Sequence, residues 1–186
     1  MGFPWKRSLA LVVLLVAFYY LDSIKHHGYI FEPKVLQEVA QSAIAKNYTS
    51  TAKTIDHIVK ALDKHYPGHV NKVQEWVFNN AGHTGRFLAD DYFIILEGEQ
   101  WAFYPGAFEK EVYTPGHMHH LPRGFAQQYR MPDKCWALEY ARGWIPLMLP
   151  FGLADTFSST LDFYTLAQTF KVYGKCVINE LLQNKF

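Results

Sequence analysis

Cysteine is scarce in this sequence, and an excess of charge of either sign is missing. The 186 residues include two cysteines, Cys135 and Cys176, which lack the C-x-x-C spacing of a zinc or thiol-redox site. Two cysteines are also too few for a disulfide-stabilised secreted scaffold, so we expect two free, partly buried thiols. Eighteen basic and 17 acidic residues give a net charge of +1, which argues against a nucleic-acid-binding protein.

Charged residues are few in total, at 19%, whereas hydrophobic residues make up 49% and aromatic residues 17%. This composition rules out a disordered chain. The length suits one compact domain with room for an appendage. A chain so rich in aromatic residues and so poor in charge has the material to line a large apolar cavity.

A stretch without any charge lies near the N-terminus, from Leu9 to Leu21, just after Lys6 and Arg7. A positive segment before an apolar stretch fits either a signal peptide or a membrane anchor. Small residues in an A-x-A arrangement are missing behind it, which disfavours cleavage. The stretch is short for a full span, but the thin bilayer of the endoplasmic reticulum accepts this length. We therefore predict a single-pass membrane anchor over residues 1–26.

The orientation of this anchor follows from its flanking charges. Lys6 and Arg7 precede the span, which predicts a cytosolic N-terminus and a lumenal position for the rest of the chain. The glycosylation sequon that begins at Asn47 agrees with a lumenal side.

Behind the anchor, the chain divides into three stretches. In residues 27–81, apolar residues recur at helical spacing and predict two helices, the second from near Ser50 to a turn at Pro67-Gly68. In residues 82–143, short apolar runs alternate with turn signals and predict a small sandwich or barrel. In residues 144–186, apolar helical stretches too short or too often interrupted to span predict helices lying against a membrane. The expected strands cover residues 93–96, 99–104, 111–113, 126–129 and 135–138.

Three acidic residues stand in apolar surroundings: Asp90 and Asp91 begin an apolar strand, and Glu139 lies in an aromatic one. Acidic side chains are seldom buried unless they are paired or functional. Glu139 could form an ion pair with Arg142 or face solvent. Alternatively, it is a carboxyl in an apolar cavity, whose pKa burial raises until it can donate a proton near neutral pH. A second carboxylate nearby would divide the pair into one acid and one base.

Histidine and arginine offer weaker candidates. His117 and His119 would share one face of a strand, as a metal site requires, but no carboxylate follows within residues 121–124. We therefore favour surface or core histidines and predict no metal. Arg86 and Arg142, each beside a glycine, are most simply structural partners of carboxylates.

Seven short motifs follow one another along the chain in a specific order. Together they closely resemble the family of fungal sterol delta-8 to delta-7 isomerases and animal sigma non-opioid receptors. The resemblance runs from the N-terminal anchor to the C-terminal residues, and seven motifs in order make a chance match very improbable. The motifs cover His65–Val70, Gly82–Arg86, Ala89–Tyr92, Glu99–Trp101, Glu111–Gly116, Trp136–Pro146 and Ala154–Asp162.

The resemblance implies an α+β fold with an N-terminal transmembrane helix, a cupin-like β-barrel and two C-terminal helices that close the pocket against the membrane. It implies a homotrimer in the membrane of the endoplasmic reticulum, with a sterol substrate and contact with membrane lipid. Lipophilic cationic amines would bind as inhibitors. The reaction, a shift of a ring double bond from delta-8 to delta-7, requires no cofactor.

The resemblance also implies which residues form the site. In the receptor branch an Asp and a Glu hold the cationic ligand. The Glu matches Glu139; the Asp matches Asp91 when the sequences are anchored on Gln100-Trp101, and Asp90 is the alternative. One carboxyl would protonate C9, and its ionised partner would remove a proton from C7. Four aromatic residues are expected to bind the substrate and stabilise the carbocation: Tyr92, Trp101, Tyr140 and Trp144.

Two alternatives to an isomerase remain. One is a non-catalytic, sigma-receptor-like membrane protein that binds lipophilic amines or sterols. The other is a cupin metalloenzyme that uses His117 and His119.

One departure from the family concerns the junction of Ala81 and Gly82, which are adjacent here. Family members carry a further apolar, Gly-rich segment at this point, which contributes early strands of the barrel. We therefore expect a shortened barrel with open sheet edges and a missing cavity wall. The activity of the shortened chain needs its own test.

Overall fold

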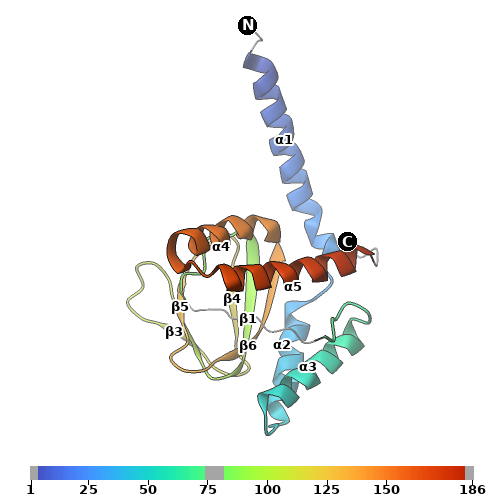
Figure 1. Ribbon diagram of the computed structural model, residues 1–186, viewed down its shortest axis with the longest axis vertical. Coiled ribbons are helices and arrows are strands. Elements are labelled where there is room, and N and C mark those ends of the chain that lie inside the picture. Colours follow the sequence, from blue (N-terminus) through green and yellow to red (C-terminus); the bar gives the residue numbers. More distant parts are fainter. Residues whose placement is uncertain (1–3, 74–81, 183–186) are drawn as a thin grey trace. The chain divides into compact units, whose positions relative to one another are not determined.

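The computed structural model describes residues 4–73 and 82–182, and the chain divides into two compact units, Met1–Ile30 and Phe31–Phe186 (Figure 1). The Ala81 side of the junction and the last residues of the expected helical stretch lie outside the described residues. The boundaries expected at residues 26 and 81 stay predictions.

The first unit contains α1, from Pro4 to Ile24, followed by a short 3-10 turn, η1, from Lys25 to Gly28. An α-helix of 21 residues is roughly 30 Å long, which matches the hydrocarbon core of a bilayer. Its uncharged Leu-Val-Ala run makes it long and apolar enough to cross a membrane. Asp22, near its end, forms an ion pair with Lys25. A helix long and apolar enough to span a membrane is thus present, as the sequence predicts.

The second unit begins with a helical hairpin made of α2, Pro33–Ala45, and α3, Thr51–His65. Pro33 occupies the first turn, where the missing N–H is tolerated. Ala40 and Ala43 are completely buried, and their small side chains let the hairpin approach the sheet closely. The hairpin and the sheet share one core, whose buried members are Leu36, Val39, Ala40, Ala43, Ile58, Leu62, Ile94 and Leu96. Both predicted helices are confirmed.

Within the described residues, six strands form two antiparallel sheets. In the first sheet, β1 (Ala89–Glu97) lies between β4 (Met118–Leu121) and β6 (Trp136–Gly143). In the second, β2 (Gln100–Phe103) lies between β3 (Glu111–Tyr113) and β5 (Gln128–Arg130). The sequence predicted these strands approximately, except β4. It was missed because two of its four residues are histidines, and the burial of His119 depends on partners elsewhere in the chain.

A closed cupin-like barrel is not confirmed, and the described residues form two three-stranded sheets instead. Closure would require further strands between the edges of the two sheets. In the part of the chain that the structure describes, those edges are β4, β6, β3 and β5, each with one strand partner. This agrees with a chain in which Ala81 joins directly to Gly82.

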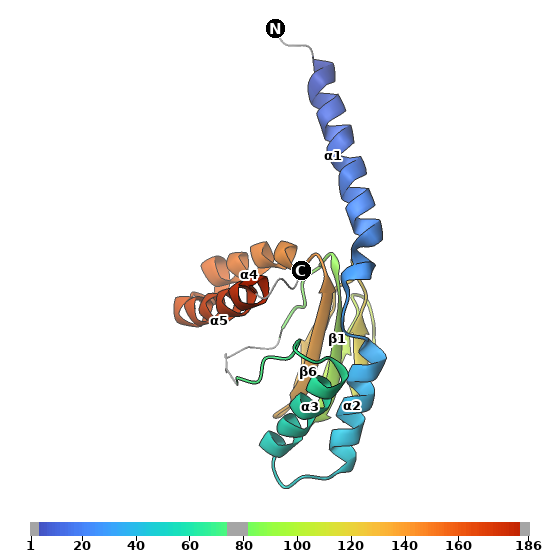
Figure 2. The same cartoon turned by 90° about the vertical axis from the view of Figure 1, so that its right-hand side faces the viewer.

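Helices return after β6: the 3-10 turn η2 (Ile145–Met148), α4 (Leu149–Asp155), the π-turn η3 (Thr156–Thr160) and α5 (Phe163–Leu182). Figure 2 shows α4 and α5 side by side. None of the described residues of α4 or α5 is buried. Their exposed apolar side chains include Leu149, Phe151, Phe163, Tyr164, Phe170 and Leu181. A large exposed apolar surface of this kind marks contact with a membrane or a protein. The predicted helices are confirmed, and their membrane contact stays a prediction.

Gly98 connects the two sheets at a point where no other residue fits, which yields a stability prediction. Gly98 and Gly106 have nearly the same positive φ, 80° and 82°, but a Cβ on Gly98 would lie 2.1 Å from the carbonyl oxygen of Lys134, whereas one on Gly106 would meet open space. Gly106→Ala should cost about 1–2 kcal/mol from the backbone conformation. Gly98→Ala should cost clearly more, seen as a lower midpoint of thermal unfolding in detergent. Equal midpoints for the two variants would contradict this packing.

Candidate functional site

A cavity of about 480 Å³ lies between the two sheets. Its walls come from β1, β4 and β6 on one side and from β2 and β5 on the other, and Met148 of η2 contributes from the C-terminal helices. The lining residues are Thr84, Phe87, Asp91, Phe93, Gln100, His119, Leu121, Tyr129, Met131, Cys135, Ala137, Glu139 and Met148.

Strand register brings Asp91 and Glu139 together. Glu139 on β6 lies opposite Phe93 on β1, and Asp91 lies opposite Ala141. Because side chains alternate along a strand, Asp91, Phe93 and Glu139 point to the same face of the sheet. Asp91 and Glu139 are therefore diagonal neighbours on adjacent strands, a separation that side chains can bridge. Both predicted acids line the cavity.

The cavity changes the acidity of both carboxyls. Burial raises the pKa of Asp91 to about 7, and the neighbouring charge of Glu139 adds to the rise. Burial also raises the pKa of Glu139. The Glu139 side chain is exposed and lines the cavity, so water reaches it there. Oδ1 of Asp91 is buried and has no hydrogen-bond partner among the described residues. The pair can thus hold one proton near neutral pH.

Two further polar groups stand beside the carboxyls. Tyr129 of β5 lines the cavity from the second sheet, and its pKa is raised by burial and by the charges of Glu139 and Asp91. Cys135 lines the same cavity; burial raises its pKa, and it is a free thiol, as is Cys176. The free thiols were predicted, but no local sequence pattern indicates that Tyr129 or Cys135 lies at the site.

Asp90, the alternative to Asp91, lies on the opposite face of β1. Its Oδ1 lies 3.2 Å from Nε2 of His120 and accepts a hydrogen bond from the backbone N–H of Arg123. Across the strand pair it faces Arg142, which donates a hydrogen bond to the hydroxyl of Tyr92. Asp90 is absent from the cavity wall because adjacent strand residues point to opposite faces.

The predicted role of Arg86 needs correction, whereas a carboxylate partner for Arg142 other than Glu139 stays a prediction. Arg86 donates to the backbone carbonyl of Gly124, not to a carboxylate. An ion pair between Glu139 and Arg142 is excluded by the strand geometry, because residues three apart on a strand point to opposite faces. Arg142 instead lies over the ring of Tyr92 on the other side of the sheet.

The four aromatic residues predicted to bind the substrate do not line the cavity. Tyr92 and Tyr140 lie on the α2 side of the first sheet, where their rings stack 6.1 Å apart. Trp101 lies on the outer face of the second sheet, and its Nε1 donates to Glu99. The aromatic rings that do line the cavity belong to Phe87, Phe93 and Tyr129.

The histidines do not form a chelating pair. His117 is exposed just before β4, with its Nδ1 2.9 Å from Oγ1 of Thr114, whereas His119 is buried and has both ring nitrogens beside glutamine side chains. Within residues 4–73 and 82–182, no group of three or more His, Cys, Asp or Glu side chains is placed to hold a metal ion.

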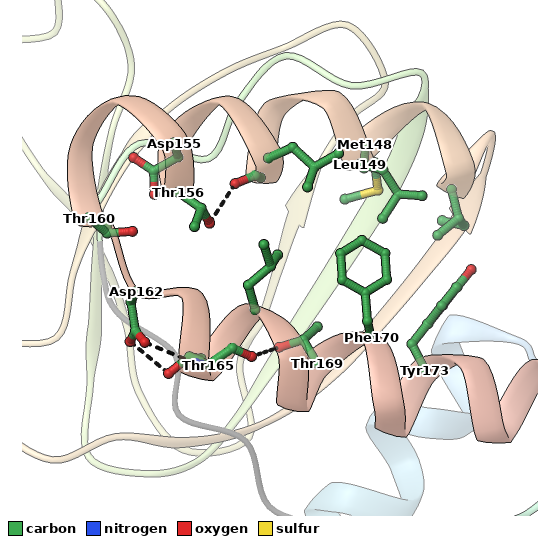
Figure 3. A pocket seen from close by; sticks show the side chains of 14 residues that line it. Met148, Leu149, Asp155, Thr156, Thr160, Asp162, Thr165, Thr169, Phe170 and Tyr173 are labelled. Atoms are coloured by element: carbon green, nitrogen blue, oxygen red, sulfur yellow. Dashed lines mark hydrogen bonds between the residues drawn. The ribbon is translucent and has the colours of Figure 1, made fainter.

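A second cavity, of about 580 Å³, lies between α4 and α5 (Figure 3). Leu149 and Phe170 give it an apolar wall, and Met148 lines both this cavity and the one between the sheets. Asp162 at its rim is exposed and accepts hydrogen bonds from the backbone and side chain of Thr165, which lower its pKa. This cavity offers an apolar surface but no pair of acids with raised pKa values, so the candidate site is the cavity between the sheets.

The chain matches a known family over most of its length. The family model described as "ERG2 and Sigma1 receptor like protein" matches residues 8–82 and 81–185. The chain belongs to this family. Its two matching parts meet at the Ala81–Gly82 junction.

Similar proteins divide into two groups. "C-8 sterol isomerase erg2" of Aspergillus fumigatus is 48% identical over 205 residues, covering 94% of this chain and 86% of the relative. "C-8 sterol isomerase ERG2" of Gibberella zeae is 43% identical and covers 96% of this chain and 88% of the relative. "Sigma non-opioid intracellular receptor 1" of Taricha granulosa is more distant, 28% identical over 94% of this chain and 91% of the receptor. The 205-residue alignment is longer than this 186-residue chain, so the relative has residues without a counterpart here.

The raised pKa of Asp91 predicts how stability depends on pH. Between its ordinary pKa of 3.8 and about 7, the folded chain holds a proton at Asp91 that the unfolded chain has released. The stability that the protonated Asp91 carboxyl provides is therefore complete below about pH 3.8 and is lost as pH rises through about 7. Asp91→Asn should raise the thermal midpoint relative to the unsubstituted chain more at about pH 8 than at about pH 5. Asp90→Asn, a change one residue away on the opposite face, should lack this pattern. A pH-independent effect of Asp91→Asn would contradict the assignment.

Proposed function

We propose that this chain is a sterol isomerase that moves the ring double bond from delta-8 to delta-7, with Asp91 and Glu139 as its acid and base. The observation that carries the proposal is a pair of carboxyls with raised pKa values in one cavity. The names of the fungal relatives support the reaction. The chemistry needs only proton transfers, so these side chains suffice without a cofactor.

The reaction needs one proton given and one taken. The protonated carboxyl gives its proton to C9, and the two electrons of the C8–C9 double bond form the new C9–H bond, leaving a tertiary carbocation at C8. The ionised carboxyl then takes a proton from C7, and the electrons of that C–H bond form the C7–C8 double bond. Afterwards the two carboxyls have exchanged protonation states, and proton exchange through water in the cavity restores them. Either residue can start as the acid.

The cavity stabilises the carbocation in two ways. The carboxylate places a negative charge in surroundings of low polarity, where its attraction for a cation is stronger than in water. Phe93 is on the same strand and sheet face as Asp91, directly opposite Glu139, and Tyr129 lines the cavity from the second sheet. Aromatic faces attract cations, so these two rings take the role that the sequence assigned to Tyr92 and Tyr140.

The membrane environment follows from the substrate and the helices. A sterol resides in lipid, and we propose that α1 anchors the chain in the membrane of the endoplasmic reticulum with a cytosolic N-terminus and a lumenal catalytic unit. The exposed apolar sides of α4 and α5 contact membrane lipid. A homotrimer is the expected assembly by family resemblance.

Activity of the shortened chain can be tested in an isomerase-deficient yeast strain that accumulates delta-8 sterol. The unsubstituted chain should restore delta-7 products. Glu139→Gln and Asp91→Asn should each lower conversion at least about 100-fold, since a positioned acid or base contributes roughly 10²–10⁴. Asp90→Asn should keep most of the conversion. Sterol composition measured by mass spectrometry, with expression checked by immunoblot, gives the answer.

Three results would count against the proposal. Full conversion by a folded Glu139→Gln variant would remove the acid–base role. Loss of conversion in Asp90→Asn alone would move the role to the other face of β1. Amine binding without conversion, unchanged when the missing segment is restored, would favour the receptor-like alternative.

Lipophilic amines provide a separate test, because a cation resembles the carbocation. A quaternary ammonium carrying an alkyl chain does not titrate, so any pH dependence of its binding belongs to the protein. Its affinity should rise as pH rises through about 7, where Asp91 ionises. If binding lowers the pKa of Asp91 by one unit, the chain with ionised Asp91 binds the ammonium about tenfold more tightly than the chain with protonated Asp91. Asp91→Asn should abolish the rise, measured by equilibrium dialysis in detergent; an unchanged rise would contradict the assignment.

A further inference from the structure

A buried polar chain connects the two sheets at the wall of the carboxyl cavity. Nε2 of His119 lies 2.6 Å from Oε1 of Gln127, and its Nδ1 lies 2.9 Å from Oε1 of Gln100. The amide nitrogen of Gln127 donates to Oε2 of Glu111, which also accepts from the hydroxyl of Tyr113. Three side chains of this network are almost fully buried: Gln100, His119 and Gln127.

The network fixes which hydrogens its members carry. Gln127 uses its amide nitrogen for the Glu111 carboxylate, so its oxygen must accept from Nε2–H of His119. Burial lowers the pKa of His119, which favours the neutral ring. Nδ1 of a neutral ring with hydrogen on Nε2 is an acceptor, so it must receive a hydrogen from the amide of Gln100. A half-turn of the Gln100 amide exchanges its oxygen and nitrogen, which are assigned from the hydrogen-bond network. The nitrogen then donates to Nδ1 of His119, and the carbonyl oxygen is left for another partner.

That second end of the Gln100 amide faces the cavity. Gln100 and His119 both line it, and the amide nitrogen of Gln100 as placed has no hydrogen-bond partner among the described residues. A network that holds one amide in place at the wall of the cavity is prepared to form a hydrogen bond with a hydroxyl group of a ligand.

The position of this amide relative to the acids suits a sterol. On the cavity face, Phe93 lies between Glu139 on one neighbouring strand and His119 on the other. Strands are roughly 4.8 Å apart, so His119 and Glu139 start about 10 Å from each other, with Asp91 diagonal to both. In a sterol, ring A with its 3-hydroxyl is fused directly to ring B, which carries the C8–C9 bond. A hydroxyl held beside His119 therefore brings ring B towards the two carboxyls.

We propose that Gln100, held in place by His119, Gln127 and Glu111, binds the 3-hydroxyl of the sterol and thereby sets which ring bond lies between Asp91 and Glu139. Gln100 is then a substrate-binding residue, and His119 is a positioning residue that orients its amide. The inference rests on the proposed sterol function and specifies how the substrate is oriented at that site.

A binding comparison tests this without requiring turnover. The probes are a saturated 3-hydroxy sterol and the matching sterol that lacks the hydroxyl, each titrated into the full chain in detergent and followed by quenching of tryptophan fluorescence. The unsubstituted chain should bind the hydroxy sterol about five- to tenfold more tightly, the effect of one hydrogen bond in a cavity. Gln100→Met keeps the length of the side chain and should reduce this ratio to about one. Gln128→Leu, a change in the exposed neighbour of Gln127, should leave the ratio unchanged.

The ratio separates recognition from damage to the fold, because a loosened cavity weakens both probes alike. If Gln100→Met does not fold, Gln100→Asn keeps the amide but withdraws it by one methylene, and it should give an intermediate ratio. His119→Phe, which keeps a ring to stack on Tyr113, should lower the ratio by freeing the Gln100 amide. The proposal would be overturned if Gln100→Met kept the affinity ratio of the unsubstituted chain, or if Gln100→Asn and His119→Phe both kept it. Failure of Glu139→Gln to affect isomerisation would overturn the proposed function and leave this ratio intact.

Discussion

Two carboxyls on adjacent strands share one cavity, where burial and their mutual repulsion oppose the ionisation of both, and the rest of the site depends on this constraint. Asp91 and Glu139 point to the same face because their strands pair in a register that places Glu139 opposite Phe93. A shift of one residue would turn either acid into the helical core. The register is fixed on the opposite face, where Ile94 and Leu96 pack against the buried side of α2. The packing of the apolar core thus sets the strand register, and the register brings together the two carboxyls whose pKa values are raised.

The site has a cost in stability, which the surroundings offset. An acidic pair placed in a cavity opposes folding at neutral pH, because the charged forms lose hydration. The other face of the same strand compensates with satisfied groups: Asp90 has His120 and the Arg123 backbone as partners, and Tyr92 has Arg142. Buried polar groups usually have hydrogen-bond partners. One face of β1 keeps this rule and the other breaks it at Asp91, which is typical of a functional site.

The sequence pointed to two acids that line the cavity and to aromatic residues that do not, for one physical reason. Asp90, Asp91 and Glu139 were singled out by their apolar surroundings, the family motifs then favoured Asp91 and Glu139, and the structure places these two on the cavity wall. The aromatic residues chosen beside them, Tyr92 and Tyr140, are adjacent in sequence and so point the other way. Strand alternation applied to Asp91 would have selected Phe93. Pairing between distant segments carries no local signal, which is why Tyr129 and β4 were missed.

Helices were easier to predict than the closure of the sheets. The 3.6-residue periodicity of α2 and α3 and the uncharged run of α1 are local properties of the sequence. Whether sheets close depends on every strand being present, and the junction at Gly82 joins segments that the longer relatives keep apart. The described strands still build a cavity with both acids in it.

The most direct test of the account is the fate of solvent hydrogen during turnover. A delta-8 sterol incubated with the full chain in vesicles made up in deuterium oxide should yield a delta-7 product with one deuterium at C9, because the acid exchanges its proton with water before each turnover. Nuclear magnetic resonance of the product locates the deuterium. A delta-7 product without deuterium at C9, or no conversion by a chain that binds the sterol, would contradict the account.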